Sequence, residues 1–129
     1  MKAQFHFILI DDNPLDLFIH EKLLSLSDST ASVRTFNNGE VALHYLTNEG
    51  EKLPESIILF DLQMPGMNGF EFADAFKKLN TSLLKKMRLF ILSSTVDRTD
   101  IEKVRAHPHI ENLLSKPLDV ASLIKTLNS

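Results

Sequence analysis

Three short apolar runs without an interrupting polar residue constrain this fold more than any other feature of the sequence. They are Phe7–Ile10, Ile57–Phe60 and Leu89–Leu92. Uninterrupted runs of this length suit strands that are covered on both faces, as in a parallel sheet, because a strand with one exposed face alternates apolar and polar residues instead. The sequence therefore predicts a central parallel sheet.

Segments with helical spacing alternate with these runs. Strands are expected at residues 5–10, 33–36, 56–60, 88–92 and 110–114. Helices are expected where apolar residues share one helix face: Leu15, Phe18, Ile19, Leu23 and Leu26; Val41, Tyr45 and Leu46; Phe72, Ala73, Phe76 and Leu79; Ile101 and Val104; and Val120, Leu123, Ile124 and Leu127. Strand and helix alternate five times, which predicts an α/β domain with right-handed crossovers.

Details of the helix pattern add three expectations. Asn13 and Pro14 are a ready N-cap and first residue for the first helix. The apolar stripe of Ile101 and Val104 is weak, so that helix is expected to be the least buried. Residues 47–55 and 80–87 are interpreted as ordinary connections.

The composition excludes several classes of function. A chain of 129 residues fits one domain, and the absence of cysteine excludes disulfides, thiol catalysis and thiolate metal sites. Charges are spread along the chain and sum to −3, so no nucleic-acid partner is expected. The first apolar run ends at Asp11, too early for a signal peptide, and no run is long enough to span a membrane. We therefore expect a cytoplasmic protein without a membrane partner.

Polar residues whose side chains can bind ligands or react follow the predicted strands. In open parallel sheets, binding sites form beyond the carboxyl ends of the strands. The residues at those positions are Asp11, Asp12, Asp61, Ser93, Ser94 and Lys116. Carboxylates, hydroxyls and an amine are therefore expected to point into one crevice.

This set of groups suits phosphoryl chemistry assisted by a metal ion. Carboxylates at a separation of about 4 Å repel one another by roughly 1–4 kcal/mol per pair, depending on the dielectric, and a hard divalent cation offsets that repulsion. Magnesium prefers oxygen ligands and often binds carboxylates together with phosphate oxygens. Lys116 is a point charge suited to a phosphoryl oxygen. An aspartate beside the metal can itself act as a nucleophile and form an aspartyl-phosphate.

Each of these residues also has a plainer interpretation. Asp12 or Asn13 can serve only as a helix N-cap. Ser93 and Ser94 can simply open the following loop, and Lys116 before a proline can be a solvated turn residue. Their arrangement at successive strand ends favours a common site.

Four motifs, in this order, make the chain similar to a known family. They are Ile8-Leu9-Ile10-Asp11-Asp12, Phe60-Asp61-Leu62-Gln63-Met64-Pro65-Gly66-Met67-Asn68-Gly69, Ile91-Leu92-Ser93-Ser94 and Ser115-Lys116-Pro117. Along essentially its whole length the chain resembles the receiver domain of response regulators in two-component signalling, of the single-domain chemotaxis type. The resemblance implies a flavodoxin-like (βα)5 fold, doubly wound, with a five-stranded parallel sheet of strand order 2-1-3-4-5.

The resemblance also implies a metal-dependent phosphoacceptor. Asp61 would accept a phosphoryl group from the phosphohistidine of a sensor histidine kinase or phosphotransfer protein. Asp12 would bind Mg²⁺ (or Mn²⁺) directly, Asp11 would bind it through a water, and Asp61 with the backbone carbonyl of Gln63 would complete the metal site. No enzyme activity is implied beyond self-phosphorylation and autodephosphorylation at Asp61.

Other residues of the motifs take supporting roles in the family. Ser93 matches the switch hydroxyl, and Lys116 would contact the phosphoryl oxygens. The bond from Lys116 to Pro117 is typically cis. Gln63 and Thr95 stand where family members tune the lifetime of the phosphate.

Signal output is expected to rely on protein contact. Residues 1–129 are expected to be one receiver domain without an output domain. The expected output surface lies on the predicted fourth helix, fifth strand and fifth helix, and its downstream protein target is unknown. The family often has Tyr or Phe at the position of Leu113, so the switch here is expected to be read in another way.

Three alternatives compete with this interpretation. A haloacid-dehalogenase-type phosphatase also uses an aspartate nucleophile, but it needs a second Asp where this chain has Gln63. A flavodoxin-like FMN-binding protein needs a phosphate loop where this chain has Asp11 and Asp12. A pseudo-receiver that acts without phosphorylation is favoured only by Leu113.

His20 and His44 are interpreted as structural or surface residues.

Overall fold

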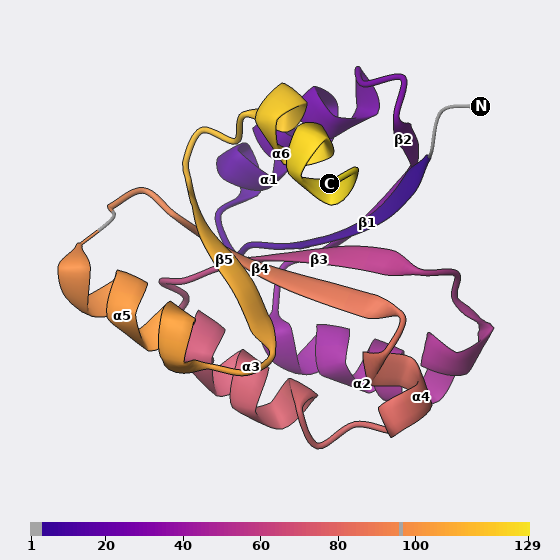
Figure 1. The fold of residues 1–129 in the computed structure, drawn as a ribbon, viewed down its shortest axis with the longest axis vertical. Helices are drawn as coiled ribbons and strands as arrows, with labels where there is room; N and C mark the ends of the chain where they lie inside the picture. Colours follow the sequence, from indigo (N-terminus) through magenta and orange to yellow (C-terminus); the bar gives the residue numbers. More distant parts are fainter. Residues whose placement is uncertain (1–3, 96) are drawn as a thin grey trace.

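A parallel sheet of five strands forms the centre of the computed structural model, which describes residues 4–95 and 97–129 (Figure 1). The strands are β1 (Phe5–Ile10), β2 (Thr30–Phe36), β3 (Ser56–Asp61), β4 (Met87–Ser93) and β5 (Ile110–Ser115). Their order is β2-β1-β3-β4-β5, and every neighbouring pair is parallel. The predicted fold is confirmed; residues 1–3 and 96 of the predicted domain lie outside the described part of the chain.

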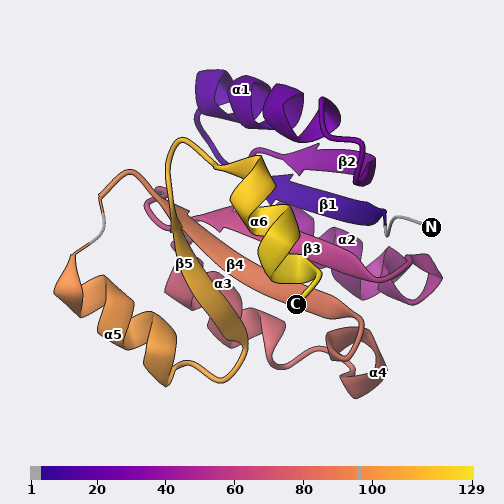
Figure 2. The same ribbon diagram turned by 45° about the horizontal axis from the view of Figure 1, so that its top comes forward.

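Helices cover both faces of the sheet. The α-helices are α1 (Pro14–Ser25), α2 (Gly39–Glu49), α3 (Gly69–Phe76), α4 (Thr81–Leu84), α5 (Arg98–Ala106) and α6 (Val120–Leu127). Figure 2 shows α1 and α6 on one face, with α2, α3 and α5 on the other. The short α4 and the 3-10 turn η1 (Gly50–Lys52) lie in segments expected to be connections, so the predicted fourth and fifth helices are α5 and α6.

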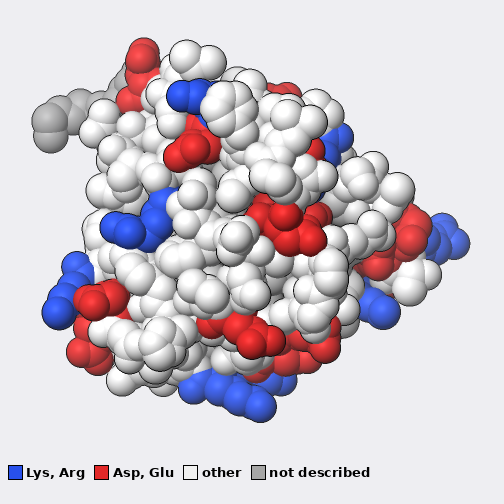
Figure 3. All heavy atoms as spheres, turned by 180° about the vertical axis from the view of Figure 1, so that it is seen from behind, with Lys and Arg blue, Asp and Glu red and all other residues white. Residues whose placement is uncertain are grey.

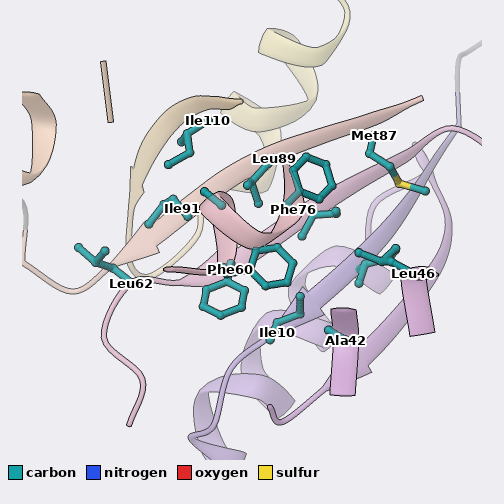
Figure 4. Close-up of a cluster of buried hydrophobic side chains, with 14 of the residues drawn as sticks. Ile10, Ala42, Leu46, Phe60, Leu62, Phe76, Met87, Leu89, Ile91 and Ile110 are labelled. Carbon is teal, nitrogen blue, oxygen red and sulfur yellow. The ribbon is translucent and has the colours of Figure 1, made fainter. Parts of the chain in front are cut away.

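Alternate residues of the central strands enter two separate cores. In β3, Ile58 and Phe60 face α2 and α3, whereas Ile57 and Leu59 face α1 and α6. Side chains from the sheet and the helices point toward one another in the first of these cores (Figure 4). Every residue of β3 is buried, as expected for a strand covered on both faces.

Asparagine side chains fix where several helices begin. The Asn13 carboxamide oxygen accepts hydrogen bonds from the backbone N–H groups of Leu15 and Asp16, and Pro14 is the first helical residue. Asn68 and Glu71 form a reciprocal capping box at the start of α3. The predicted start of the first helix is therefore confirmed.

The predicted core-facing stripe of α1 is wrong. Leu15, Phe18 and Leu26 are 65%, 56% and 82% exposed, and the buried residues of the helix are His20 and Leu24. The helix carries apolar residues around most of its circumference, so their spacing alone does not single out one face. His20 takes an inward position, where its Nε2 accepts a hydrogen bond from the Leu118 backbone N–H.

The remaining helices follow their patterns more closely. Phe72, Ala73 and Phe76 of α3 are fully or almost fully buried, and α6 buries Leu123 and Leu127. In α2 the buried residues are Gly39, Ala42 and Leu46, whereas Val41, predicted on the apolar face, is half exposed. Helix α5 buries only Val104, in agreement with its weak stripe.

The surface shows no concentration of one charge on the face opposite to that of Figure 1. Figure 3 shows Lys and Arg side chains dispersed among Asp and Glu on this face. Among the described residues, no helix is both long and apolar enough to cross a membrane.

Candidate functional site

The carboxyl ends of the inner strands bring the sequence-predicted residues together. Asp61 is the last residue of β3 and Ser93 the last of β4, and Asp11 directly follows β1. The backbone N–H of Lys116 donates to the Ser93 carbonyl at 2.9 Å, which places the end of β5 beside the end of β4. One edge of the sheet therefore holds residues that lie more than one hundred positions apart in the sequence.

Three carboxylates form an acidic cluster at this edge. Asp11, Asp12 and Asp61 each offer an oxygen, and these atoms lie within 4.8 Å of one another. Asp11 is fully buried and Asp61 is 7% exposed, whereas Asp12 is exposed to solvent. The Asn13 backbone N–H donates to Asp11 Oδ1 at 2.9 Å and fixes that carboxylate in place. The cluster is thus open on the side of Asp12.

Lys116 supplies the positive charge of the cluster. Its Nζ donates hydrogen bonds to Asp11 Oδ2 at 2.9 Å and to Asp16 Oδ2 at 3.0 Å. The same Nζ lies 3.4 Å from Asp61 Oδ1. A single ammonium group therefore lies among three carboxylates that come from the loop after β1, from the end of β3 and from helix α1.

The protonation equilibria reflect burial and crowding of like charges. Burial, followed by the charge of Asp11, raises the pKa of Asp61 to about 6, against the opposing effects of Lys116 and of the Gln63 backbone N–H. Burial by itself lowers the pKa of Lys116, but its hydrogen bonds to Asp11 and Asp16 and the nearby carboxylate charges raise it overall. Asp61 is therefore a carboxylate with little stabilisation of its negative charge by the protein alone.

The chemistry of these groups fits a hard divalent cation. The converging ligand atoms are all carboxylate oxygens, which Mg²⁺ prefers. Negative charge is in excess, because the cluster and Asp16 together outnumber the one ammonium group. A bound cation would relieve this excess and lower the pKa of Asp61.

The connection from β3 to α3 shapes the wall of the site. The Gln63 backbone N–H lies 3.4 Å from Asp61 Oδ1, and Met64 turns inward and is buried. Gly66 has a φ of 87°, a left-handed conformation that side chains with a Cβ rarely adopt. A Cβ at Gly69 would approach Ile91 Cδ1 to 3.0 Å, so glycine lets α3 begin close against the sheet. The carbonyl of Gln63 as a metal ligand stays a prediction.

The two serines after β4 differ in their surroundings. Ser93 is buried, and its hydroxyl donates to the Thr95 carbonyl while accepting a hydrogen bond from the Thr95 backbone N–H at 3.2 Å. Ser94 is exposed. Only Ser93 therefore has the enclosed position expected of the switch hydroxyl, and its hydroxyl is engaged in its own loop. The peptide bond between Lys116 and Pro117 is cis, as the resemblance implied.

Sequence reasoning missed two residues of helix α1 that contact the Lys116 loop. Asp16 binds the ammonium of Lys116, and His20 Nε2 accepts a hydrogen bond from the Leu118 backbone N–H at 3.2 Å. Asp16 and His20 are four residues apart and so lie on the same helix face. In the sequence the two residues are only a polar pair within a largely apolar helix, which does not indicate their partners at Lys116 and Leu118.

A doubly wound domain that gathers carboxylates and one lysine beyond its central strands belongs to the class of open α/β proteins whose polar side chains converge in a strand-end crevice. Comparison with known proteins narrows this class. The sequence model of the response regulator receiver domain matches residues 7–128. The chain belongs to this family and is a receiver domain of the two-component response regulator type.

Individual relatives agree with this assignment. The chain is 32% identical over 133 residues to the two-component response regulator ARR17 of Arabidopsis thaliana, with 97% of this chain and 84% of the relative covered. Response regulators of that plant, this one included, are matched over 55% to 84% of their own length.

Solved structures share the fold. A crystal structure of a response regulator receiver protein from Dyadobacter fermentans superimposes with a TM-score of 0.91 and 46% identity, over 96% of this chain and 95% of the other. The receiver domain of the histidine kinase CKI1 from Arabidopsis thaliana, in complex with Mg²⁺ and BeF3⁻, superimposes with a TM-score of 0.81 at 18% identity, over 96% and 89% of the two chains.

Proposed function

We propose that this receiver domain accepts a phosphoryl group on Asp61 from a phosphohistidine donor and that the phosphorylated state is read by a protein partner. One observation carries the proposal: a buried carboxylate of raised pKa lies within reach of two further carboxylates and one lysine at the end of β3. Receiver domains are generally regulatory and pair with histidine kinases or phosphotransfer proteins.

The proposed transfer is a displacement at phosphorus. A carboxylate oxygen of Asp61 forms a bond to phosphorus while the bond from phosphorus to the imidazole nitrogen of the donor breaks. The nitrogen keeps the electron pair of the broken bond, and the imidazole leaves neutral when its other nitrogen already carries a proton. Lys116 would offer an N–H donor to a phosphoryl oxygen, and Ser93 would offer its hydroxyl after it leaves the Thr95 carbonyl. Positioning and charge neutralisation are the main demands of this reaction.

Asp11, Asp12 and Asp61 would hold Mg²⁺, together with the Gln63 carbonyl. When bound, the cation would neutralise charge that develops on the transferred group. Asp12 is the exposed member and faces the solvent from which the cation and the donor arrive. Asp11 is held by Lys116 and by the Asn13 backbone N–H, so its orientation is fixed by the protein.

The first prediction tests this function by mass. The protein is incubated with a small phosphodonor such as acetyl phosphate and Mg²⁺, and its intact mass is measured. We expect a gain of one phosphoryl group, because Asp61 needs no donor protein to reach a small molecule in an open cluster. A chelator in the reaction is expected to prevent the gain, since the carboxylate repulsion would then be unrelieved. Metal-independent labelling would contradict the role of Asp12, and no labelling with metal present would favour a pseudo-receiver.

We also propose that the phosphodonor protein contacts the exposed apolar stripe of α1. Leu15, Phe18 and Ile19 lie on one helix face and remain exposed in the folded chain. The helix begins two residues after Asp12, so the stripe adjoins the acidic cluster. A protein that places its phosphohistidine over Asp61 must cover this neighbouring surface, where apolar contacts supply binding energy.

The second prediction concerns this stripe. Phe18→Ser is expected to reduce phosphoryl transfer from a phosphorylated histidine phosphotransfer protein about 5-fold or more, as for a residue central to an interface. Labelling by acetyl phosphate should be unchanged, because the acidic cluster is intact. Leu26→Ser is the matched control: Leu26 is also apolar and exposed, but it lies roughly 12 Å further along the helix axis than Phe18 at 1.5 Å per residue. Equal loss in both variants, or no loss in either, would contradict the proposed contact.

For output, we propose the surface formed by α5, β5 and α6. Helix α5 buries a single residue, which leaves most of its length available to a partner. Leu113 of β5 is half-buried and packs against the core on the α5 side. Without an aromatic ring at Leu113, the signal must reach a partner by a different movement.

A further inference from the structure

Helix α1 holds the Lys116 loop at two points. Asp16 binds the Lys116 side chain at 3.0 Å, and one turn later His20 binds the backbone of the same loop at Leu118. The sequence separations are 100 and 98 residues, so both contacts are made by tertiary packing alone. Helix α1 and the connection from β5 to α6 are therefore joined by one contact to a side chain and one to the backbone.

The backbone contact is the more permanent of the two. His20 is buried, and its Nε2 accepts the Leu118 N–H, which assigns the ring proton to Nδ1. Burial, and then the charge of Lys116, lower the pKa of His20, so the ring stays neutral and remains an acceptor. A buried N–H that loses its acceptor is costly. The contact between His20 and Leu118 therefore holds the loop backbone even when the Lys116 side chain changes its partners.

The ammonium of Lys116 has a carboxylate near each of its three possible N–H donors. It has three N–H donors and makes hydrogen bonds to Asp11 and Asp16, while Asp61 Oδ1 lies at the longer distance of 3.4 Å. A phosphoryl group on Asp61 would add oxygens with a charge of about −1.5 to −2, which are stronger acceptors than a carboxylate. These oxygens would draw the ammonium toward Asp61, now its most distant partner, and such a movement would lengthen its contact with Asp11 or with Asp16.

Burial decides which contact gives way. The Asp11 side chain is 0% exposed, and a buried carboxylate that loses its partner is strongly destabilised. The Asp16 side chain is 36% exposed, and water can replace the ammonium there at little cost. Asp16 is therefore the acceptor that Lys116 can leave.

We propose that Asp16 is a resting-state acceptor for Lys116 and that a phosphoryl group on Asp61 displaces it, which detaches the first turns of α1 from the Lys116 side chain. The inference rests on the proposed phosphoacceptor function. Asp16 acts through Lys116 and is a positioning residue. Because Asp16 directly follows Leu15 in the first turn of α1, its release would change the contacts of this turn on phosphorylation, and this response needs no aromatic ring at Leu113.

The test compares wild type with Asp16→Asn and uses beryllofluoride with Mg²⁺ as the phosphoryl mimic. Removal of a competing charged acceptor is expected to tighten beryllofluoride binding about 2- to 5-fold, the range of a partly exposed ion pair. Magnesium alone should bind the variant no more tightly than wild type, because the freed ammonium then sits closer to the carboxylates. Glu21→Gln is the control, since it removes one carboxylate from the same helix but not an acceptor of Lys116.

A second readout follows the helix itself. In wild type, beryllofluoride is expected to shift the backbone amide NMR signals of residues 16–20, and in Asp16→Asn these signals should already lie near the bound position. Unchanged or weaker beryllofluoride binding by the variant would overturn the inference, because a residue that only stabilises the fold would weaken both ligands together. If wild type itself fails to bind beryllofluoride with Mg²⁺, the phosphoacceptor function fails and this inference fails with it.

Discussion

Asp61→Asn is expected to abolish phosphoryl uptake and at the same time to stabilise the fold. An amide nitrogen or oxygen does not replace the carboxylate as a nucleophile, so the mass gain seen with acetyl phosphate and Mg²⁺ should vanish. The other groups of the site remain, since Lys116 keeps its hydrogen bonds to Asp11 and Asp16. Robust uptake by this variant would place the acceptor elsewhere.

The stabilisation follows from the raised pKa of Asp61. Its folded-state pKa is about 6, whereas its ordinary value is 3.8. The contribution of this group to stability is complete below the ordinary value and is lost as the pH rises through about 6, where the folded protein must carry the buried charge. Asp61→Asn removes that charge, so the free energy of unfolding at pH 7.5 should rise by about 1–3 kcal/mol, from 1.36 kcal/mol per pKa unit.

Urea unfolding of metal-free protein at several pH values measures this effect. The difference between variant and wild type should be largest near neutral pH and should shrink toward pH 4, and Mg²⁺ should stabilise wild type more than the variant. Asp74→Asn is the control, because Asp74 is an exposed carboxylate on α3 that pairs with His107 and Lys77. A variant that is less stable than wild type at every pH would show that Lys116 fully compensates the charge of Asp61.

The central strands and the strand-end residues were predictable because their signals are local. Uninterrupted apolar runs mark β1, β3 and β4, and the polar residue that ends each run is the last residue of the strand or directly follows it, as for Asp61, Ser93 and Asp11. The strands extend one to three residues beyond some of the runs, as in β2, which begins at Thr30. Polar residues of β2 join the sheet because they pair with β1 through backbone hydrogen bonds, and the hydropathy pattern does not indicate this pairing.

The orientation of α1 and the contact of Asp16 with Lys116 were not predictable from such local signals. Helix α1 has apolar side chains on most of its sides, and the way in which the helix packs on the sheet decides which of them are buried. His20 takes an inward position only because the Leu118 N–H approaches it from the other end of the chain. Asp16 reaches Lys116 through the same packing, and in the sequence it is an ordinary acidic residue in the first turn of a helix.

Phe72→Ala is expected to cause the largest loss of stability among these substitutions. Phe72 is fully buried, and its ring centroid lies 4.3 Å from that of Phe60 and 6.1 Å from that of Phe76. Truncation of a buried Phe to Ala lowers the free energy of unfolding by about 3–5 kcal/mol, since apolar contacts are lost and a cavity is left. That is a large part of the total of roughly 5–15 kcal/mol for a typical domain, so a fraction of the variant should be unfolded at moderate temperature.

Phe18→Ala is the matched truncation on the surface. Phe18 is 56% exposed, so its loss removes little buried area, and urea unfolding followed by circular dichroism should show a much smaller change. Phe72→Leu should recover part of the stability, because most of the ring volume is replaced. Phosphoryl uptake is a second readout, because Phe60, which contacts Phe72, immediately precedes Asp61. If the contact between the two rings stabilises the sheet without taking part in the chemistry, folded Phe72→Leu should still take up a phosphoryl group. Equal losses for Phe72→Ala and Phe18→Ala would contradict the burial of Phe72 in the core.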